Sequence, residues 1–513
     1  MTETNQKYDA DVAIIGYGPS GVVAANMLGK RGVKTIAIER FKDIYARARA
    51  VTVNDWTMRI VQDLGLAEQQ LAVMDGMHSL RWVDYEGREL TWMPFPSSIY
   101  GYATAYCLYQ PEMERVLREG VERYSNVDVR YEREMTTLRQ DEGGVTIGMS
   151  NLATGETETI RVKYVLACDG GSSRTRQELG VELIGDTLSV RWVVIDCRVK
   201  RWWPNRHMHT FWSDARRPVV DIPLGLGNHR WEFPLNPDES DADFQSHDQL
   251  WRLLNSLGVT ENEVEIHQHA FYNHHVRHAE RWRVGRVLLC GDAAHLMPPW
   301  AGSGMQSGMR DAQNASLKLV EVLEGRLPED LLDTYEQERA PDVARYTNIS
   351  VGLGMIIKRE LSDEQVAAMM EEERATGDLP MVLRPPHYQQ GWLQKGKGSK
   401  DVVGKFLPQP RAANCKGQVG LLDELTGNGL IVLGANTDPA SKLDAEQKAA
   451  WEMLGATFIA VRSADQRAQA DDDVFDINGE LIAWMQKEDV DVVVVRQDKI
   501  VAAASGNLNV PAL

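Results

Sequence analysis

Cysteine is scarce in this sequence and disulfide or zinc spacing is missing. The five cysteines are scattered without a CxxC pair, at Cys107, Cys168, Cys197, Cys290 and Cys415. This pattern disfavours a disulfide framework and a structural zinc site, and we expect no bound metal. No apolar run approaches the roughly 20 residues that cross a bilayer. The amino terminus is polar before it enters a strand, so no signal peptide is visible and the expected location is a reducing cytoplasm.

Positive charge is also in deficit, with 56 Lys and Arg against 74 Asp and Glu and a net charge of −18. This balance argues against nonspecific nucleic-acid binding and against an anionic membrane surface. The 43% hydrophobic and 25% charged residues are otherwise ordinary for a globular protein. A chain of 513 residues exceeds one typical core, which predicts two or three domains.

The first motif follows a short apolar strand, Asp11–Ile15, and has the pattern G-x-G-x-x-G. Gly16 permits a tight turn, Gly18 lets a pyrophosphate approach the backbone, and Gly21 lets the next helix pack on the sheet. A second apolar strand then ends in Glu39, at the distance where an acid bonds the ribose of an adenosine. Such an acid disfavours a 2′-phosphate, so the pattern predicts FAD or NAD rather than NADP.

Two further strands end in an aspartate. The run YVLAC ends at Asp169 and opens D-G-x-x-S-x-x-R, and the run VLLC ends at Gly291 and Asp292. The second of these continues into a Pro-Pro pair and a glycine-rich loop, residues 298–308, before a helix. Strand, acidic turn, glycine loop and helix start together predict a backbone-lined cradle for a polar ligand. Taken alone, a tight βα turn explains this stretch equally well.

The remaining segments suggest how the domains are arranged. Residues 181–280 are strand-like and rich in Trp, His and Arg, which predicts a sheet domain inserted between two halves of a nucleotide-binding domain. A β-hairpin is expected around residues 86–87, and a helix over 331–343 should break at Pro341. Residues 376–410 are expected to be a linker before a small α/β tail. Near the first motif, Arg47, Arg49 and Arg59 are candidates for a phosphate or flavin edge, or for a solvated basic face.

In this order, the three motifs resemble the single-component flavin-dependent aromatic hydroxylases, the p-hydroxybenzoate and phenol hydroxylase superfamily. The resemblance spans residues 9–345 and is closest to the 3-(3-hydroxyphenyl)propionate hydroxylase branch, through ARAVTVNDWTMRIVQDLGL and GDAAHLMPPWAGSGMQSGMRDAQN. It implies an α/β fold: a Rossmann-like FAD-binding domain of the GR2 type, an inserted β-sheet substrate domain and a C-terminal thioredoxin-like domain. The tail reads Arg496-Gln497-Asp498 where that family commonly has Arg-Pro-Asp, and it has no CxxC.

The resemblance also implies domain boundaries. The FAD-binding domain is expected in three parts, the substrate domain in two, and the tail in one: 1–80, 106–180 and 281–395 (the last with additional helices), then 81–105 and 181–280, then 400–513.

Tightly bound FAD is the implied cofactor, with NADH or NADPH binding transiently and O₂ as co-substrate. In the family, the Asp169 motif serves both FAD and NAD(P)H, Asp292 bonds the ribityl chain or pyrophosphate, and Pro299 lies near the flavin ring. The residues that the resemblance assigns to the cofactor are Gly16, Gly18, Gly21, Glu39, Arg40, Arg49, Gln110, Asp169, Asp292, Pro299, Gly302, Gly304 and Met305.

The implied reaction is hydroxylation of a small phenolic substrate by the C4a-hydroperoxide of the flavin. The protein must position the ring, take the phenolic proton and exclude water, and histidine is the natural base near neutral pH. Candidate catalytic residues are Arg47, His209 and Tyr272, with His207, His229, His274 and His275 as further candidates, whereas His295 is expected to pack structurally. Two alternatives stay open: a flavoprotein monooxygenase of the same fold acting on a polyketide, quinone or alkene, and a non-catalytic dinucleotide-binding protein. A homodimer is neither required nor excluded.

Overall fold

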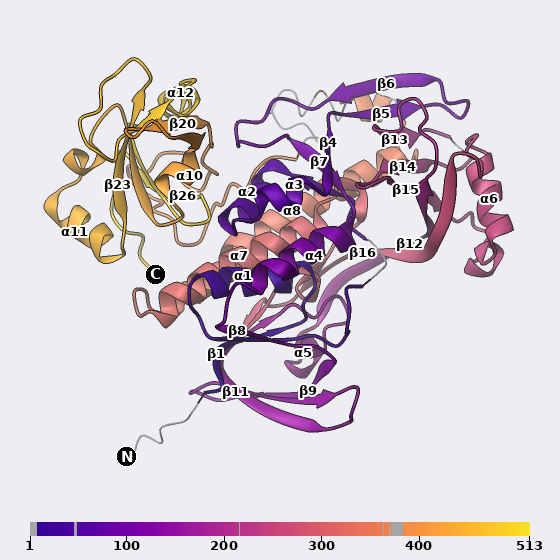
Figure 1. Cartoon of the computed structure of the whole chain (residues 1–513), viewed down its shortest axis with the longest axis horizontal. Coiled ribbons are helices and arrows are strands. Elements are labelled where there is room, and N and C mark those ends of the chain that lie inside the picture. Colours follow the sequence, from indigo (N-terminus) through magenta and orange to yellow (C-terminus); the bar gives the residue numbers. More distant parts are fainter. Residues whose placement is uncertain (1–7, 46–48, 215, 363, 369–370, 372–382) are drawn as a thin grey trace.

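The computed structural model describes residues 8–45, 49–214, 216–362, 364–368, 371 and 383–513 (Figure 1). Its first sheet has a parallel core with the strand order β8-β2-β1-β11-β18. These strands come from distant parts of the chain: β1 Ala10–Ile15, β2 Thr35–Ile38, β8 Val127–Arg130, β11 Thr157–Ala167 and β18 Val287–Leu289. β1, β2 and β18 are short apolar runs, buried over nearly their whole length, as expected for strands covered on both faces. β17 Arg283–Val284 and the pair β9 Arg133–Gln140 and β10 Val145–Asn151 extend the sheet.

Helices cover this sheet and carry the chain between its strands. α1 Pro19–Lys30 packs against both α4 Gln110–Val121 and α7 Gly304–Leu323. The shorter helices of this part are α2 Asp55–Asp63, α3 Ala67–Leu71 and α5 Arg174–Glu178. A small sheet, in the order β3-β7-β4, lies beside them and contains β3 Thr52–Asn54, β4 Met74–Met77 and β7 Ala105–Leu108.

The long helix α8, Thr334–Ile357, corrects one expectation from the sequence. It runs through Pro341 without a break, although proline removes one helical hydrogen bond. Buried side chains on both sides of the proline hold the helix in place: Glu338 and Arg339 before it, and Asp342 and Tyr346 after it. Tertiary packing therefore overrides the local cost of the proline.

The second sheet is formed mainly by the segment between β11 and β18, with a hairpin added from further upstream and one short strand from just after β18. Its order is β19-β16-β12-β15-β14-β13-β5-β6. Its strands are β5 Ser79–Val83, β6 Glu89–Pro94, β12 Leu183–Val199, β13 His209–Trp212, β14 Val219–Pro223, β15 Asn228–Pro234, β16 Val264–Ala279 and β19 His295–Leu296. The turn between β5 and β6 confirms the predicted hairpin at residues 86–87. Helix α6, His247–Asn255, packs on one face, where it buries Trp231, Val193 and Phe233. The opposite face is left for the cavity described below.

The carboxyl-terminal part forms a third sheet, seen at the upper left of Figure 1. Its order is β21-β20-β24-β23-β22-β25-β26, in which β22 pairs in parallel with β23 and antiparallel with β25. This is the arrangement of a thioredoxin-like domain. Its elements are β20 Arg411–Asn414, β21 Val419–Leu421, α10 Leu422–Thr426, β22 Ile431–Ala435, α11 Ala445–Met453, β23 Thr457–Ser463, β24 Val474–Asp476, α12 Glu480–Lys487, β25 Val492–Val495 and β26 Val501–Ala504. In the described part of the chain, no helix has the length and apolar character needed to cross a membrane.

Two buried ion pairs dock this third domain. Arg496 donates to both oxygens of Glu338 on α8, at 2.7 and 2.9 Å, and Glu338 also pairs with Lys318 on α7 at 2.8 Å. Arg59 on α2 donates to both oxygens of Asp423 at 3.0 Å. Arg59 is therefore buried in a domain contact, which corrects its assignment as a flavin contact or solvated cation. Burial opposes ionisation of Glu338, but Arg496 and Lys318 together hold its pKa below the ordinary value.

We expect Arg496→Met to loosen this docking, because it leaves the Glu338 carboxylate and its neighbours without their main counterion. Removing one partner of a buried pair costs about 3–5 kcal/mol. The first urea unfolding transition should move to lower concentration, and protease should cut sooner between the domains. Lys400→Ala removes a pair with the highly exposed Asp489 and serves as the control, with little expected loss of stability because solvent screens this pair. Equal effects of the two substitutions would contradict this assignment.

Candidate functional site

The predicted motifs meet at one edge of the first sheet. Because β1, β2, β11 and β18 run in parallel, their carboxyl ends lie together. Gly16, Glu39, Asp169 and Asp292 follow these four strand ends. In open α/β sheets, ligands bind at this edge. Residues more than 250 positions apart in the chain (292 − 16 = 276) thus become neighbours through strand pairing alone.

The turn after β1 requires glycine at two positions. Gly16 has φ +92°, and a Cβ there would lie 2.3 Å from the carbonyl oxygen of Cys168. A Cβ on Gly21 would lie 2.0 Å from the carbonyl oxygen of Gly16. Gly18 differs, since a Cβ there would meet no atom within 4 Å. It forms the amino-terminal boundary of α1, where no side chain caps the free N–H groups. The turn therefore leaves an open approach to a helix amino terminus, the arrangement that binds phosphate.

Glu39 is held at the end of β2 by the backbone. Its carboxylate accepts hydrogen bonds from the N–H of Tyr17 at 2.8 Å and of Phe41 at 2.9 Å. These bonds fix a buried acid beside the first turn. Arg40 points elsewhere: its largely exposed side chain pairs with Glu134 at 3.4 Å.

The Asp169 carboxylate makes its hydrogen bonds within its own loop. Its carboxylate accepts from the Ser173 hydroxyl at 2.6 Å and from the N–H and hydroxyl of Thr175, each at 2.9 Å. Arg176, from the same motif, donates to the carbonyl oxygens of Ala293 and Gly171. The motif thus joins the ends of β11 and β18, while the adjacent Gly170 lines the cavity.

Asp292 faces Arg49 across the middle of the site, with 3.0 Å between the Arg49 guanidinium and Oδ2. Gln110 positions the arginine, because its Oε1 accepts from the N–H groups of Arg49 at 2.8 Å and Ala50 at 2.7 Å. Both charged side chains keep substantial exposure, 56% for Arg49 and 29% for Asp292. They are placed to exchange their mutual contact for contacts to a ligand.

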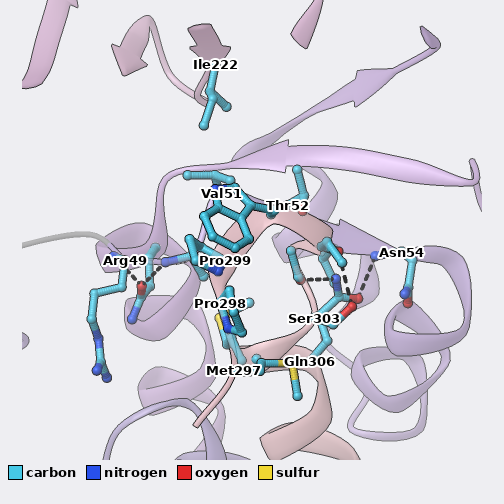
Figure 2. Close-up of a pocket in the computed structure, with 18 of the residues that line it drawn as sticks. Arg49, Val51, Thr52, Asn54, Ile222, Met297, Pro298, Pro299, Ser303 and Gln306 are labelled. Atoms are coloured by element: carbon cyan, nitrogen blue, oxygen red, sulfur yellow. Dashed lines mark hydrogen bonds between the residues drawn. The ribbon is translucent and has the colours of Figure 1, made fainter. Parts of the chain in front are cut away.

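The glycine-rich loop forms the next part of the wall (Figure 2). Gly302 has φ +60°, and a Cβ there would lie 2.3 Å from the Thr52 hydroxyl oxygen, so only glycine fits. Gln306 fixes the loop by donating to the Gly302 carbonyl at 2.7 Å while accepting from the N–H of Asn54 at 3.0 Å. Helix α7 begins here with Ser303 as its uncapped boundary. A second helix amino terminus therefore points to the cavity.

A buried network holds the strand end and the loop together. The Asp311 carboxylate on α7 accepts from the Gly291 N–H at 3.0 Å, from His295 Nε2 at 2.6 Å and from Arg339 Nε at 2.8 Å. His295 is 2% exposed and packs on Trp282. It belongs to the support of the site, as expected from the sequence.

The second sheet covers the cavity from the opposite side. Cross-strand register aligns His209, Ile222 and Arg230 in one row, and Phe211, Val220, Glu232 and Val194 in the next. Figure 2 shows Ile222 projecting from this sheet toward Val51 and Pro299. The two walls enclose a cavity of about 390 Å³. Its largely apolar lining suits an aromatic ring.

Two of the three predicted catalytic residues line this cavity, His209 and Tyr272, and so do the further candidates His274 and His275, whereas His207 and His229 do not. Burial lowers the pKa of His209 and of His274 to about 4, so both are neutral near pH 7. Burial raises the pKa of Tyr272. Arg47 lies outside the described residues.

Eight of the predicted cofactor residues line the same cavity: Gly18, Arg49, Gln110, Asp292, Pro299, Gly302, Gly304 and Met305. Gly16, Gly21, Glu39, Arg40 and Asp169 do not. The lining runs from one uncapped helix amino terminus, past an Arg–Asp pair, to a second. An elongated ligand with a charged middle and an electron-rich ring at one end fits this series of groups.

Sequence reasoning missed the charged residues of β15. Arg230 and Glu232 alternate with the buried Trp231 and Phe233 in the strand HRWEFP, so both point to the cavity. Arg230 is held by both oxygens of Asp196, at 2.7 and 3.0 Å. Charged residues two apart inside an apolar strand are a signal that could have identified them, because such positions are costly without a purpose.

Comparison with known proteins adds an independent line of argument. The model of the FAD binding domain family matches residues 9–350, and that of the HcaD C-terminal domain matches residues 404–513. The 3-(3-hydroxy-phenyl)propionate/3-hydroxycinnamic acid hydroxylase of Klebsiella pneumoniae (strain 342) is 33% identical over 97% of this chain and 92% of its own. The hydroxylase of the same name from Mycolicibacterium smegmatis is 34% identical over 96% and 90%.

Solved structures share the fold. The flavin-dependent monooxygenase PieE, in complex with FAD and substrate, aligns with a TM-score of 0.80 at 22% identity over 98% of this chain and 97% of its own. Aklavinone-11 hydroxylase, in a ternary complex with FAD and aklavinone, aligns with a TM-score of 0.80 at 20% identity over 98% and 96%.

The first turn offers a paired test of fold against ligand binding. Gly21→Ala forces a contact with the Gly16 carbonyl and should destabilise the protein by about 1–3 kcal/mol. Gly18→Ala has open space and an ordinary φ of −76°, so thermal stability without ligand should stay at the wild-type value. The same methyl group lies where a phosphate must approach, so FAD content should fall. Thermal melting of the apoprotein and flavin absorbance measure the two effects; full flavin content in Gly18→Ala would argue against a phosphate at this turn.

Proposed function

The chain belongs to the family of FAD-dependent aromatic hydroxylases, and we propose that its cavity holds a single-ring phenol between the flavin site and the second sheet. It is a monooxygenase that hydroxylates a phenolic ring with NAD(P)H and O₂. The observation that carries the proposal is the shared cavity: cofactor-type residues form one wall, and one face of the second sheet, with apolar and a few polar side chains, forms the other. The relatives' names point to 3-(3-hydroxyphenyl)propionate or 3-hydroxycinnamic acid as the first substrates to test.

The residues present fit FAD. The uncapped start of α1 at Gly18 suits the pyrophosphate, and Glu39 suits the adenosine ribose. Arg49 and Asp292 suit the polar middle of the cofactor, and the start of α7 suits the electron-rich end of the flavin ring. When bound, FAD supplies the redox chemistry that activates O₂ with electrons from NAD(P)H.

The chain's own residues would orient the phenol and shield it from solvent. Ile222, Val220 and Phe211 offer an apolar surface for the ring, facing Pro299 and Trp300 of the loop. His209 has a buried Nε2 without a hydrogen-bond partner in the described residues, so it suits a polar group of the substrate. Tyr272 lines the same space, and both remain proposed substrate contacts. The role of Arg47 in binding a carboxylate or a phenolate of the substrate stays a prediction from the sequence.

Product analysis under ¹⁸O₂ tests the function directly. The purified holoenzyme is given NADH or NADPH and either 3-(3-hydroxyphenyl)propionate, 3-hydroxycinnamate or the matched phenylpropionate that lacks the hydroxyl. Phenol-dependent oxidation of the coenzyme, with one ¹⁸O atom in the ring of the product, is expected only for the phenols. Hydrogen peroxide is measured in parallel to detect uncoupled turnover. Coenzyme oxidation that ignores all phenols, with no labelled product, would refute the proposal.

Asp292→Ala is expected to lower FAD occupancy severalfold, because it removes the carboxylate at the middle of the cofactor site. The flavin-to-protein absorbance ratio of the purified variant, before and after incubation with added FAD, measures the loss. Asp330→Ala removes an exposed carboxylate outside the cavity and should keep its flavin. Full occupancy in Asp292→Ala would remove Asp292 from the cofactor site.

A further inference from the structure

Glu232 is a buried carboxylate that the fold leaves without a hydrogen-bond partner. It lies in the middle of β15, is 6% exposed and lines the cavity. Among the described residues, none donates a hydrogen bond to its oxygens. Arg230 approaches to 3.8 Å through Nη1, but this nitrogen donates to the carbonyl oxygen of Arg49, and Nε and Nη2 bind Asp196. A carboxylate that borders the cavity and accepts no hydrogen bond from the described residues can accept one from a ligand.

The residues aligned with Glu232 on the two neighbouring strands are apolar. Val220 on β14 and Val194 on β12 flank it in register, and Phe211 lies beyond Val220 in the same row. The row containing Ile222 lies next to it, and Ile222 projects toward Pro299 and the glycine loop (Figure 2). An acceptor flanked in register by two valines and facing the cavity is positioned for a hydroxyl group of an aromatic substrate.

We propose that Glu232 is the catalytic residue that accepts the phenolic proton of the substrate. This inference rests on the proposed function and names the base for it. The phenolic O–H bond breaks as the proton moves to a Glu232 oxygen, and the electron pair stays on the phenolate, which enriches the ring carbons ortho and para to it. The proton leaves Glu232 for solvent after the product departs.

The chemistry of the neighbouring candidates favours Glu232 over histidine. Burial raises the pKa of Glu232, which makes its carboxylate a stronger base, whereas burial lowers the pKa of His209 to about 4 and makes it a weak one. A base works best when its pKa lies near the working pH. The other charged and titratable groups that line the same cavity are Arg230, His209, Tyr272, His274, His275, Cys168, Arg49 and Asp292, and Asp196 is the partner of Arg230.

Glu232→Gln keeps the shape and removes the basic oxygen. With 3-(3-hydroxyphenyl)propionate near neutral pH, we expect hydroxylation to fall at least about 100-fold while FAD stays bound. Activity should recover as the pH rises toward the ordinary phenol pKa of about 10, because solution then supplies the phenolate. Glu232→Asp should retain part of the activity. Asp186→Asn, which removes an exposed carboxylate on the same sheet, should match the wild type.

A second measurement does not depend on turnover. Pentafluorophenol is ionised at neutral pH, so its phenolate can lie beside Glu232 only if a proton is taken up. Calorimetric titration of the oxidised holoenzyme, in buffers of different ionisation enthalpy, should show uptake of about one proton for the wild type and none for Glu232→Gln. A purely structural role would not change this proton count.

Stability gives a third readout with a definite sign. A carboxyl group whose folded pKa is raised destabilises the native state as pH rises from its unfolded pKa through its folded pKa. Glu232→Gln should therefore melt at the wild-type temperature in acid and above it at neutral pH.

The outcomes separate the two proposals. Wild-type enzyme that hydroxylates no phenol refutes the proposed function. Wild-type enzyme that is active, together with Glu232→Gln that hydroxylates at the wild-type rate near neutral pH, or takes up the same proton, overturns the role of Glu232. Loss of FAD from Glu232→Gln would assign the residue to holding the cofactor and would also overturn it.

Discussion

The site depends on one buried carboxylate, Asp311, because it ties the end of β18, the residues that follow it and helix α8 to helix α7. From α7 it binds the backbone at Gly291, the ring of His295 and the guanidinium of Arg339 on α8. Burial opposes its ionisation, yet His295 and Arg339 hold its pKa below the ordinary value. The strand end that carries Asp292, the loop that follows it and the start of α7 therefore form one rigid unit, which suits a site whose geometry must be set before a ligand binds.

The two faces of the inserted sheet have different roles, one in packing and one in lining the cavity. One face packs against α6 with tryptophan, phenylalanine and aliphatic side chains and supplies the stability of the insertion. The other faces the cavity and carries a charged group, Glu232, that such a sheet would not keep for stability alone. Arg230 binds Asp196 on that face and also donates to the backbone oxygen of Arg49 at 3.0 Å, so the substrate side is tied to the cofactor side.

The third domain contacts helices α7 and α8, which support the site. It reaches α8 through Arg496 and Glu338, on the same helix that carries Arg339 to Asp311. Arg496 and Asp498 make the docking contact even though Gln497 stands between them in place of proline, and Gln497 adds a hydrogen bond to Glu321 at 3.0 Å. The domain therefore braces the two helices behind the glycine loop, which gives the tail a physical purpose without any redox motif of its own.

Local chemistry was readable from the sequence wherever a backbone conformation demanded one residue type. The ligand-binding edge of the first sheet was predicted by the glycines of the first turn, the acid after β2 and the aspartates at two strand ends. The order of these motifs along the chain indicated the family. Long-range packing decided the course of helix α8, the position of Arg59 and the position of Glu232. Pro341 stays within a helix because buried side chains on both sides hold it, and Arg59 leaves the cofactor region because Asp423, 364 residues away, captures it. The cross-strand register alone brings Glu232 over the cavity, since a one-residue slip would turn it to the opposite face.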